Sequence, residues 1–363
     1  MSSYVVSREL LERNIKELKK RAGQVPIWAV IKGDGYGIGA LPLAELLHGQ
    51  GIDHFCVTEL REAELLRANG FETESILMLR EIRDRETLHC LLDQRAILTV
   101  GSLETAAIIN DIAAHRSDIA QIHLKVDTGM GRYGFLPDQS DQLQQVYREM
   151  KNLAVCGIYT HFNCAFNNEE LTRQEFDVFM QVVTALHTAG FETGIAHCCN
   201  SSAFLKYPEM HLDGVRLGSA LLGRMSFPAG LRPVGYVQTE VEAVRLLPAG
   251  HTTGYGALWK AKQDCKIAII PVGWYHGFQV SCKPDMSRKR DCLRAALSAL
   301  KGLLKRPAAY VLIKGKKCKV IGAIGMLHCA VEVSHLDCRV GDLVELQINP
   351  LHVKGMPIVY KEF

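Results

Sequence analysis

The sequence has little excess charge and no long apolar run, and each absence removes a class of protein. Its 363 residues hold 42 Lys and Arg against 39 Asp and Glu, a formal net charge of +3. Proteins that bind nucleic acid or anionic membranes usually carry a much more basic surface. No apolar run reaches the ~20 residues that a membrane span needs. The composition predicts a soluble protein with a small-molecule substrate and neither a nucleic acid nor a membrane as partner.

Paired-cysteine motifs are also missing. The 12 cysteines are scattered, lie mostly in apolar segments and include no CxxC, and the adjacent pair Cys198-Cys199 suits neither a disulfide nor a zinc knuckle. They are expected to be free, buried thiols of a reducing compartment, and no metal site is predicted. The start MSSYVVSRELLERN lacks the basic and apolar regions of an export signal. We therefore expect a cytoplasmic protein.

What the sequence does contain is a repeated unit, a short apolar run followed by a stretch of helical periodicity, between residues 27 and 223. Helical stretches fall at 60–70, 102–115 and 174–190, and the first and last end in glycine, as a helix C-terminus often does. Eight such units in about 200 residues have the size of a (β/α)8 TIM-type barrel, with an open doubly wound sheet as the alternative. The eight predicted strands are 27–33, 54–59, 75–80, 96–100, 122–127, 155–162, 193–199 and 214–223.

From about residue 233 the sequence pattern changes to short β-type runs separated by turn signals such as PAG, KGKK and VGD. We therefore predict an α/β barrel domain over residues 1–232 and a mostly-β domain over 233–363. One segment breaks the β pattern, because residues 288–307 read as a basic amphipathic helix. A solvated insertion is favoured over a membrane or nucleic-acid surface for this helix.

Reactive side chains follow the predicted barrel strands, at the end where parallel barrels carry their chemistry. A lysine after the buried run IWAVI is expected to have a lowered pKa and to act as an amine nucleophile, although a lysine snorkelling to solvent is the simpler reading. Small polar residues after strands seven and eight suit a phosphate cup, or equally a helix N-cap. Such a lysine and such a cup together indicate a pyridoxal-phosphate barrel. The residues concerned are Lys32, Lys125, Asp127, Arg132, His161, Asn200, Ser201, Ser202, Arg216, Gly218 and Ser219.

Over nearly its whole length the chain resembles the alanine racemases, which are pyridoxal-phosphate enzymes with this barrel. AVIKGDGYGIG at 29–39 is similar to the family's cofactor-lysine segment, and LKVDTGMGRYGF at 124–135 to its second motif. THFN, HCCNSSA, VRLGSALLG, GYGALW and PVGW follow in family order. The resemblance implies pyridoxal 5'-phosphate as cofactor and racemisation of an amino acid, with alanine as the first candidate.

The resemblance also implies roles for single residues. Lys32 would bind the cofactor and act as the base on one face of the substrate, and Tyr255 from the other subunit of a homodimer would be the base on the opposite face. Arg216 would face the pyridine nitrogen, unless it is a structural partner of Asp213. Further cofactor contacts would come from Tyr36, His161, Asn200, Ser201, Gly218, Ser219 and Tyr360.

On the substrate side, the resemblance assigns the carboxylate to Arg132 and Met326. Lys125 matches a position that carries a carbamate in many racemases, and its simpler reading is an unmodified partner of Asp127. A carbamate there would orient Arg132.

Three places depart from the family pattern, all on the substrate side. Trp274 and His276 stand where Tyr and Asp are usual, Gly325 and Leu327 flank Met326 in place of Cys and Asp, and the basic insertion is unusual. Serine or another amino acid is therefore an alternative substrate, and a catalytically silent cofactor-binding homologue is a second alternative. A decarboxylase would carry a CExCD-like motif, which the sequence lacks, and a single-barrel carrier would lack the β domain.

Overall fold

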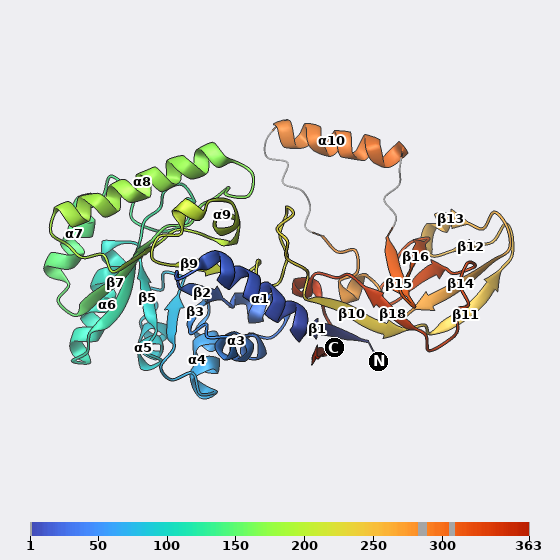
Figure 1. The fold of residues 1–363 in the computed structure, drawn as a ribbon, viewed down its shortest axis with the longest axis horizontal. Coiled ribbons are helices and arrows are strands. Elements are labelled where there is room, and N and C mark those ends of the chain that lie inside the picture. Colours follow the sequence, from blue (N-terminus) through green and yellow to red (C-terminus); the bar gives the residue numbers. More distant parts are fainter. Residues whose placement is uncertain (1, 282–288, 305–308, 363) are drawn as a thin grey trace. The chain divides into compact units, whose positions relative to one another are not determined.

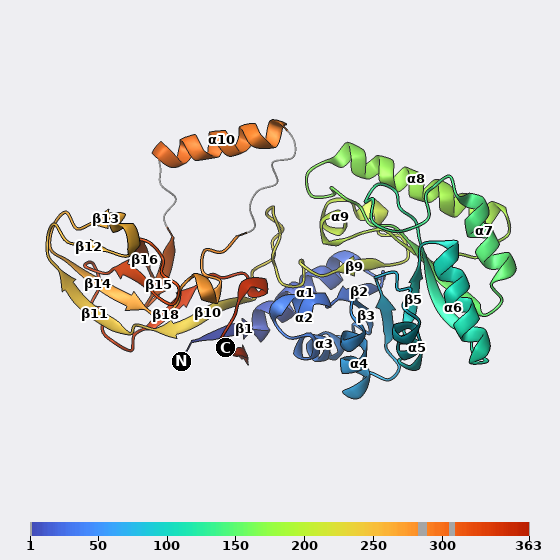
Figure 2. The same ribbon diagram turned by 180° about the vertical axis from the view of Figure 1, so that it is seen from behind.

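The computed structural model describes residues 2–281, 289–304 and 309–362, and its contacts divide the chain into two compact units (Figures 1 and 2). One unit is the continuous segment Arg8–Val234. The other is formed by the strand at the start of the chain together with the residues from Gly235 onward.

The Arg8–Val234 unit is built around eight parallel strands in the order β8-β7-β6-β5-β4-β3-β2-β9. Main-chain bonds from Asp213 to Ala196 and from Arg216 to Cys199, both 3.0 Å, join the two outermost strands, so the barrel is nearly closed. All eight predicted strands are confirmed, as is the TIM-type barrel. The strands are β2 (Ile27–Val30), β3 (His54–Val57), β4 (Ser75–Met78), β5 (Ile97–Val100), β6 (Ala120–Lys125), β7 (Leu153–Tyr159), β8 (Ile195–His197) and β9 (Val215–Leu217).

Amphipathic helices cover the outside of the barrel (Figure 1). In α8 the residues Phe179, Val182, Val183 and Leu186 recur at helical spacing and are buried, while Asn168 accepts a bond from the Leu171 N–H and caps the helix. The helices are α1 (Arg8–Ala22), α2 (Lys32–Gly37), α3 (Ala40–Gly49), α4 (Leu60–Ala68), α5 (Arg85–Asp93), α6 (Leu103–His115), α7 (Ser140–Glu149), α8 (Glu169–Thr188), α9 (Ser201–Lys206) and the 3-10 turn η1 (Pro208–Met210).

The second unit is mostly β, as predicted. A nine-stranded sheet has the order β11-β14-β17-β16-β15-β18-β10-β1-β19, and β12 and β13 form a separate hairpin. Its strands are β10 (Gly235–Glu240), β11 (Ala243–Leu247), β12 (Thr252–Thr253), β13 (Trp259–Lys260), β14 (Cys265–Ile270), β15 (Tyr310–Ile313), β16 (Lys316–Ile321), β17 (Cys329–Glu332), β18 (Leu343–Leu346) and β19 (Ile358–Lys361), with 3-10 turns η2 (Tyr255–Ala257), η3 (Trp274–His276) and η4 (Pro350–His352).

The first strand of the chain, β1 (Ser3–Ser7), lies in this sheet, although the sequence analysis grouped residues 1–232 with the barrel. It pairs antiparallel with β10 and parallel with β19, and Tyr4, Val5 and Val6 are fully buried. A strand buried on both sides needs partners for both rows of its backbone groups, and the β sheet provides them. The chain passes into the other unit only where α1 begins, at Arg8.

The predicted basic helix is also present as α10 (Lys289–Leu304), and residues 288 and 305–307 of that prediction lie outside the described part of the chain. The described cysteines form no disulfide with one another. No helix within residues 2–281, 289–304 and 309–362 combines the length and apolarity needed to cross a bilayer.

Candidate active site

Eight of the residues proposed from the sequence line one pocket at the carboxyl ends of the barrel strands. Its volume is about 250 Å³. None of the ten residues that line it is acidic, whereas a lysine and an arginine are among them. The lining consists of Val30, Lys32, Tyr36, Leu79, His161, Asn200, Ser201, Ser202, Arg216 and Ser219.

Lys32 follows directly on the buried strand β2. Burial lowers the pKa of its ammonium group, and the positive charge of Arg132 lowers this pKa further, while Glu62 acts in the opposite direction. A lysine in such surroundings spends more of its time as a neutral amine, which is the nucleophilic and basic form. This is the behaviour that the sequence analysis expected at the position.

The four residues after Lys32 form a left-handed turn, which the sequence analysis did not foresee. Gly33, Asp34, Gly35 and Tyr36 all have φ between 53° and 63°. Glycine adopts this conformation freely, but Asp34 and Tyr36 pay a cost of about 1–2 kcal/mol each. The turn therefore has to be held by other contacts.

Glu62 of α4 provides one such contact. Its side chain accepts the Gly33 N–H at 2.7 Å and, through the second oxygen, the N–H groups of Thr58 and Glu59 at 2.8 and 3.1 Å. Sequence reasoning missed Glu62 as a site residue, although a Glu at the third position of a helix is a known capping signal.

The turn brings Tyr36 against Gly218 on the far side of the pocket. A Cβ at residue 218 would lie 2.2 Å from the Tyr36 hydroxyl oxygen, so the close approach requires glycine. Burial raises the pKa of Tyr36 to about 12, which keeps its phenol protonated and able to donate a hydrogen bond.

Arg216 is 3% exposed and lies among main-chain acceptors. Its guanidinium donates to the carbonyls of His197, Thr160 and Cys198 at 3.0, 2.6 and 3.2 Å, and to Nδ1 of His197. The alternative partner, Asp213, instead accepts the Ala196 N–H at 2.9 Å. Among the residues that the structure describes, the charge of Arg216 is thus solvated by dipoles rather than paired with a carboxylate.

The histidines around Arg216 are neutral. The pKa of His161 is held well below its ordinary value, first by burial and then by the charge of Arg216, with Lys125 and Arg132 adding to the effect. His197 has a pKa lowered well below the ordinary value for the same two leading reasons.

Of the two roles that the sequence left open for the small polar residues after β8 and β9, the structure shows the helix N-cap. Asn200 is the N-cap of α9, since its side-chain oxygen accepts the N–H groups of Ser202 and Ala203 at 3.0 and 3.1 Å. The Ser201 hydroxyl accepts the N–H groups of Gly218 and Ala220 at 3.1 and 3.3 Å. Ser201 therefore holds the main chain of residues 218–220 beside the start of α9, at the place where a phosphate cup was predicted.

Lys125 ends β6 inside the barrel and is 2% exposed. Burial, followed by the charges of Arg132 and Arg216, lowers its pKa to about 7, and its Nζ lies 4.0 Å from the centre of the Tyr133 ring. Asp127 does not pair with it among the described residues. That carboxylate accepts the N–H groups of Gly129, Gly131 and Arg132 at 3.0–3.1 Å.

The β unit carries Tyr255 and Met326 in a second concavity of about 560 Å³. The Tyr255 side chain is 80% exposed, and the preceding Gly254 approaches Ala323 so closely that a Cβ would lie 2.7 Å from its N atom. No acidic residue appears in the lining, which is Thr253, Gly254, Tyr255, Ile269, Ala323, Gly325, Met326, Leu327, His328, Cys329 and Ala330.

The departures from the family pattern adjoin this second concavity. Trp274 and Tyr275 donate main-chain bonds to Gly325 and Met326 at 3.1 and 3.0 Å, so η3 and the 325–327 segment hold each other in place. His276 accepts the Gly273 N–H through Nδ1 at 3.1 Å, and burial lowers its pKa. Tyr360 lies in β19 of the same unit.

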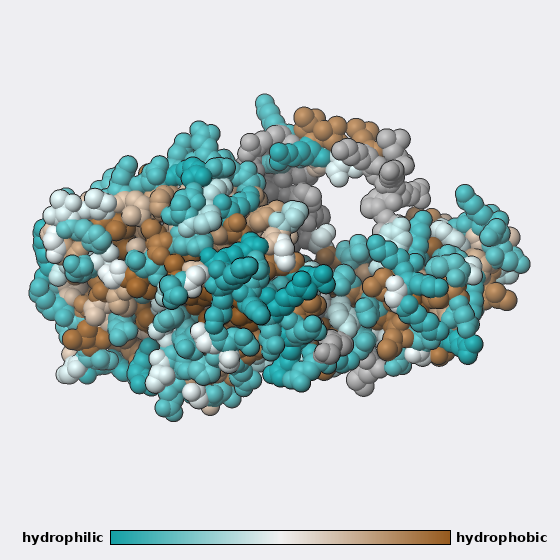
Figure 3. Space-filling view, viewed as in Figure 1, coloured by the Kyte–Doolittle hydropathy of each residue, from teal (hydrophilic) through white to brown (hydrophobic). Residues whose placement is uncertain are grey.

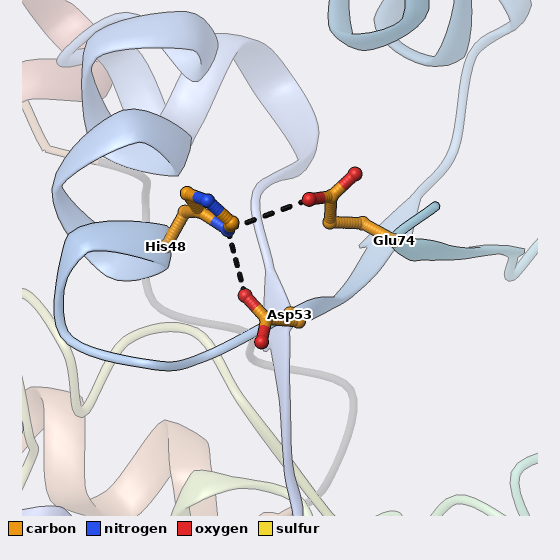
Figure 4. A group of neighbouring side chains, drawn as sticks. All are labelled: His48, Asp53 and Glu74. Atoms are coloured by element: carbon orange, nitrogen blue, oxygen red, sulfur yellow. Dashed lines mark hydrogen bonds and ion pairs between the residues drawn. The ribbon is translucent and has the colours of Figure 1, made fainter. Parts of the chain in front are cut away.

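A cluster of metal-ligand types lies away from both concavities (Figure 4). Nδ1 of His48 is 2.7 Å from Asp53 Oδ1 and 3.5 Å from Glu74 Oε1. His48 and Asp53 are half exposed, and an exposed pair of this kind contributes little to stability.

A parallel barrel whose carboxyl face presents a lysine of lowered pKa, a buried guanidinium and a group of hydroxyls defines an α/β-barrel protein suited to an anionic ligand. Two family models match the chain: the N-terminal domain of alanine racemase over residues 6–226 and its C-terminal domain over 234–354. The chain belongs to the alanine racemase family.

Individual relatives agree with this assignment. Alanine racemase of Desulforamulus reducens is 33% identical over 342 residues, covering 91% of this chain and 85% of the relative, and that of Methanococcus maripaludis is 32% identical over 92% and 85%. Among solved structures, alanine racemase of Clostridium difficile 630 has a TM-score of 0.81 at 27% identity over 98% and 88% of the two chains. The biosynthetic alanine racemase of Pseudomonas aeruginosa has a TM-score of 0.81 at 25% identity over 99% of both.

The hold of Glu62 on the left-handed turn is testable by replacing it with Gln. The amide presents one oxygen and an NH2 group to three N–H donors, so we expect the free energy of unfolding to fall by about 1–3 kcal/mol, the usual cost of unsatisfied buried donors. Urea unfolding followed by circular dichroism measures the change. Glu64→Gln, at an exposed position of the same helix, is the matched control. Equal stability of the two variants would contradict the role of Glu62.

Proposed function

We propose that this protein is a pyridoxal-phosphate-dependent racemase that interconverts L- and D-alanine in the cytoplasm. The observation that carries the proposal is the first pocket, in which Lys32 and Arg216 meet the hydroxyl groups of a tyrosine and three serines and no lining residue is acidic. Membership of the alanine racemase family over both units supports the same conclusion. When bound, the cofactor supplies an electron-withdrawing ring that stabilises the charge left on Cα after its proton is removed.

The phosphate end of the cofactor fits the side of the pocket between α9 and β9. The Ser201 and Ser219 hydroxyls line this side, the Ser201 oxygen holds the N–H groups of Gly218 and Ala220, and the protonated Tyr36 phenol lies against Gly218. Asn200 fixes the start of α9 and so orients Ser201. We assign Tyr360 as a further phosphate contact on the strength of the family resemblance.

Lys32 provides the first base. Racemisation removes a proton from one face of Cα and returns one to the other, so two groups of matched basicity are needed. The lowered pKa of Lys32 makes a neutral amine available both to bind the cofactor covalently and to accept the proton.

Tyr255 provides the second base, and we propose that it acts in the site of the partner subunit of a homodimer. The exposure of 80% is what a side chain serving another chain's site requires before assembly. An ordinary tyrosine has a pKa of about 10, so a cation near the phenol has to favour its deprotonated form. The lysines and arginines of the barrel pocket would supply that positive field.

Arg216 is assigned to the pyridine nitrogen. A guanidinium stays protonated at any working pH and has no proton to give, so the ring nitrogen remains unprotonated. Less charge then spreads over the ring, which favours return of the proton to Cα over transamination. His161, neutral beside this charge, supports the ring and contributes packing rather than a proton.

The substrate carboxylate is assigned to Arg132 and to the backbone of Met326. We further propose that Lys125 carries a carbamate that orients Arg132. A neutral amine attacks CO2 through its lone pair and releases a proton, and a pKa of about 7 makes that amine available under mild conditions. The product replaces a buried cation by an anion beside Arg132 and Arg216.

The first test is an activity assay with pyridoxal phosphate and single L-amino acids, alanine and serine among them, followed by chiral chromatography. We expect D-alanine to appear, and Tyr255→Phe to lower its rate by at least ~10³-fold because one of the two bases is lost. Visible absorbance of the lysine-bound cofactor should persist in this variant. Tyr310→Phe, at another exposed tyrosine, serves as control.

The outcome separates the alternatives. If serine is inverted and alanine is not, the substrate is serine. The apolar residues Trp274 and Leu327 beside the second concavity would then be the first positions to mutate. Cofactor absorbance without inversion of any amino acid would favour a binding protein and overturn the proposal.

The phosphate cup is tested by Gly218→Ala. The new Cβ would have to displace the Tyr36 hydroxyl from 2.2 Å, and overpacking of this kind costs about 1–3 kcal/mol. We expect cofactor affinity to fall about five- to 150-fold in an equilibrium titration. Gly49→Ala, where nothing lies within 4 Å, should leave the affinity unchanged. An unchanged affinity in Gly218→Ala would place the cofactor elsewhere.

The carbamate is tested by carbon NMR in isotopically labelled bicarbonate. Because the Lys125 pKa is about 7, the neutral amine and hence the carbamate signal should grow as the pH rises through 7 and vanish in acid. Lys125→Met should remove the signal, whereas Lys262→Met, at an exposed lysine, should not. A signal that survives Lys125→Met would refute the assignment.

A further inference from the structure

The helix α10 takes no part in the proposed reaction. It occupies Lys289–Leu304 within the β unit, in the segment that departs from the family pattern. Figure 3 shows hydrophobic residues of this helix at the surface beside hydrophilic ones.

Three leucines of α10 form an exposed stripe. Leu293, Leu297 and Leu300 follow one another at intervals of four and three residues, which places them on one face of a helix. Their exposed fractions are 63%, 50% and 57%. Single exposed leucines are common on protein surfaces, but a continuous stripe on one helix marks a surface that binds something apolar.

The same helix carries the whole excess charge of the chain. Its 16 residues contain four basic side chains and one acidic side chain, a net charge of +3. The full chain has 42 − 39 = +3, so the remaining residues have 38 of each sign and balance. The charged residues are Lys289, Arg290, Asp291, Arg294 and Lys301. The single acid lies 3.8 Å from Arg294, whose side chain remains 76% exposed.

In place of the solvated insertion that the sequence favoured, we propose that α10 is a docking surface for an anionic lipid bilayer, on which it lies in the plane of the membrane. Basic amphipathic helices with an apolar stripe bind in this way, leucines at the acyl boundary and cations among the headgroups. At 1.5 Å per residue the helix is about 24 Å long, and with its charges it is too short to span a bilayer. The function is peripheral attachment of a racemase to the membrane.

Charge decides against a second copy of the chain as the occupant. Pairing two α10 stripes would bring two segments of +3 together, and the rest of the chain offers no net negative charge to receive either one. A bilayer that contains acidic lipids supplies both an apolar layer and the opposite charge. Each Lys or Arg near such a surface strengthens binding about fivefold.

The test is flotation of the full chain with vesicles of equal parts phosphatidylcholine and phosphatidylglycerol, compared with pure phosphatidylcholine. We expect binding to the anionic vesicles only, weakened by salt. Leu297→Asp should reduce binding at least tenfold. Arg294→Glu, which leaves the leucines in place, should reduce it about 25-fold, at fivefold for each unit of charge.

Leu246→Asp is the matched control, because it makes the same change at a leucine that is 76% exposed on β11 of the same unit. It should bind within twofold of the wild type, and all variants should keep racemase activity and helical circular dichroism. The proposal is overturned if the wild type ignores anionic vesicles, binds both kinds equally, or loses no more binding in Leu297→Asp than in Leu246→Asp. Concentration-dependent self-association that Leu297→Asp abolishes, without vesicle binding, would assign α10 to a second copy instead.

Discussion

The interior of the barrel is governed by one buried positive charge that has no carboxylate beside it among the described residues. Arg216 projects into the barrel from β9, and its guanidinium donates hydrogen bonds to three main-chain carbonyls and to a histidine nitrogen. Solvation by dipoles leaves the charge itself intact, and its field acts on several buried titratable groups. The Arg216 charge lowers the pKa values of His161, His197 and Lys125, in each case adding to the effect of burial. Asp213, which the sequence offered as a partner for Arg216, accepts the Ala196 N–H instead.

The same constraint fixes how the inner histidines hold their protons. A guanidinium only donates, so Nδ1 of His197 must carry the lone pair and its Nε2 the proton. That Nε2 lies 2.9 Å from Nδ1 of His123, which must then be the acceptor. The pKa of His123 is lowered to about 3 by burial and by Arg216, so neither ring takes up a second proton near neutral pH. The hydrogen bonds from Arg216 to His197 and from His197 to His123 therefore all point away from Arg216. Neither histidine offers a proton to a ligand bound next to Arg216. Stacking of His197 on Tyr159 and Trp28 fixes its ring plane as well.

How much of this follows from the sequence depends on the range of the interactions involved. The eight barrel strands and the helices α4, α6, α8 and α10 were predictable because their apolar periodicity is local. Lys32, His161 and Arg216 could be placed at one face of the barrel because parallel strands end together. The membership of β1 in the other sheet was not predictable, because the short run SYVVS does not indicate which strands it pairs with. Its partners β10 and β19 lie more than 200 residues away in the sequence. Nor was the left-handed turn at residues 33–36, since Asp34 and Tyr36 disfavour it and only contacts such as Glu62 to Gly33 maintain it.

The strained turn and the uncompensated charge are two parts of one arrangement. The turn carries Lys32 and Tyr36 toward the pocket that Arg216 already makes positive, and Arg132 further lowers the pKa of Lys32. Folding thus collects groups that repel one another when they are charged and places one of them, Lys32, at the start of a strained turn. The repulsion costs stability as long as the pocket contains no anion. A ligand with a phosphate and a phenolic oxygen would turn this electrostatic cost into a stabilising contribution, because each cation that destabilised the folded chain would then attract the ligand. Selective binding to the folded state stabilises that state by mass action. The features that lower the pKa of Lys32 are therefore the same ones that would favour an anionic ligand in this pocket.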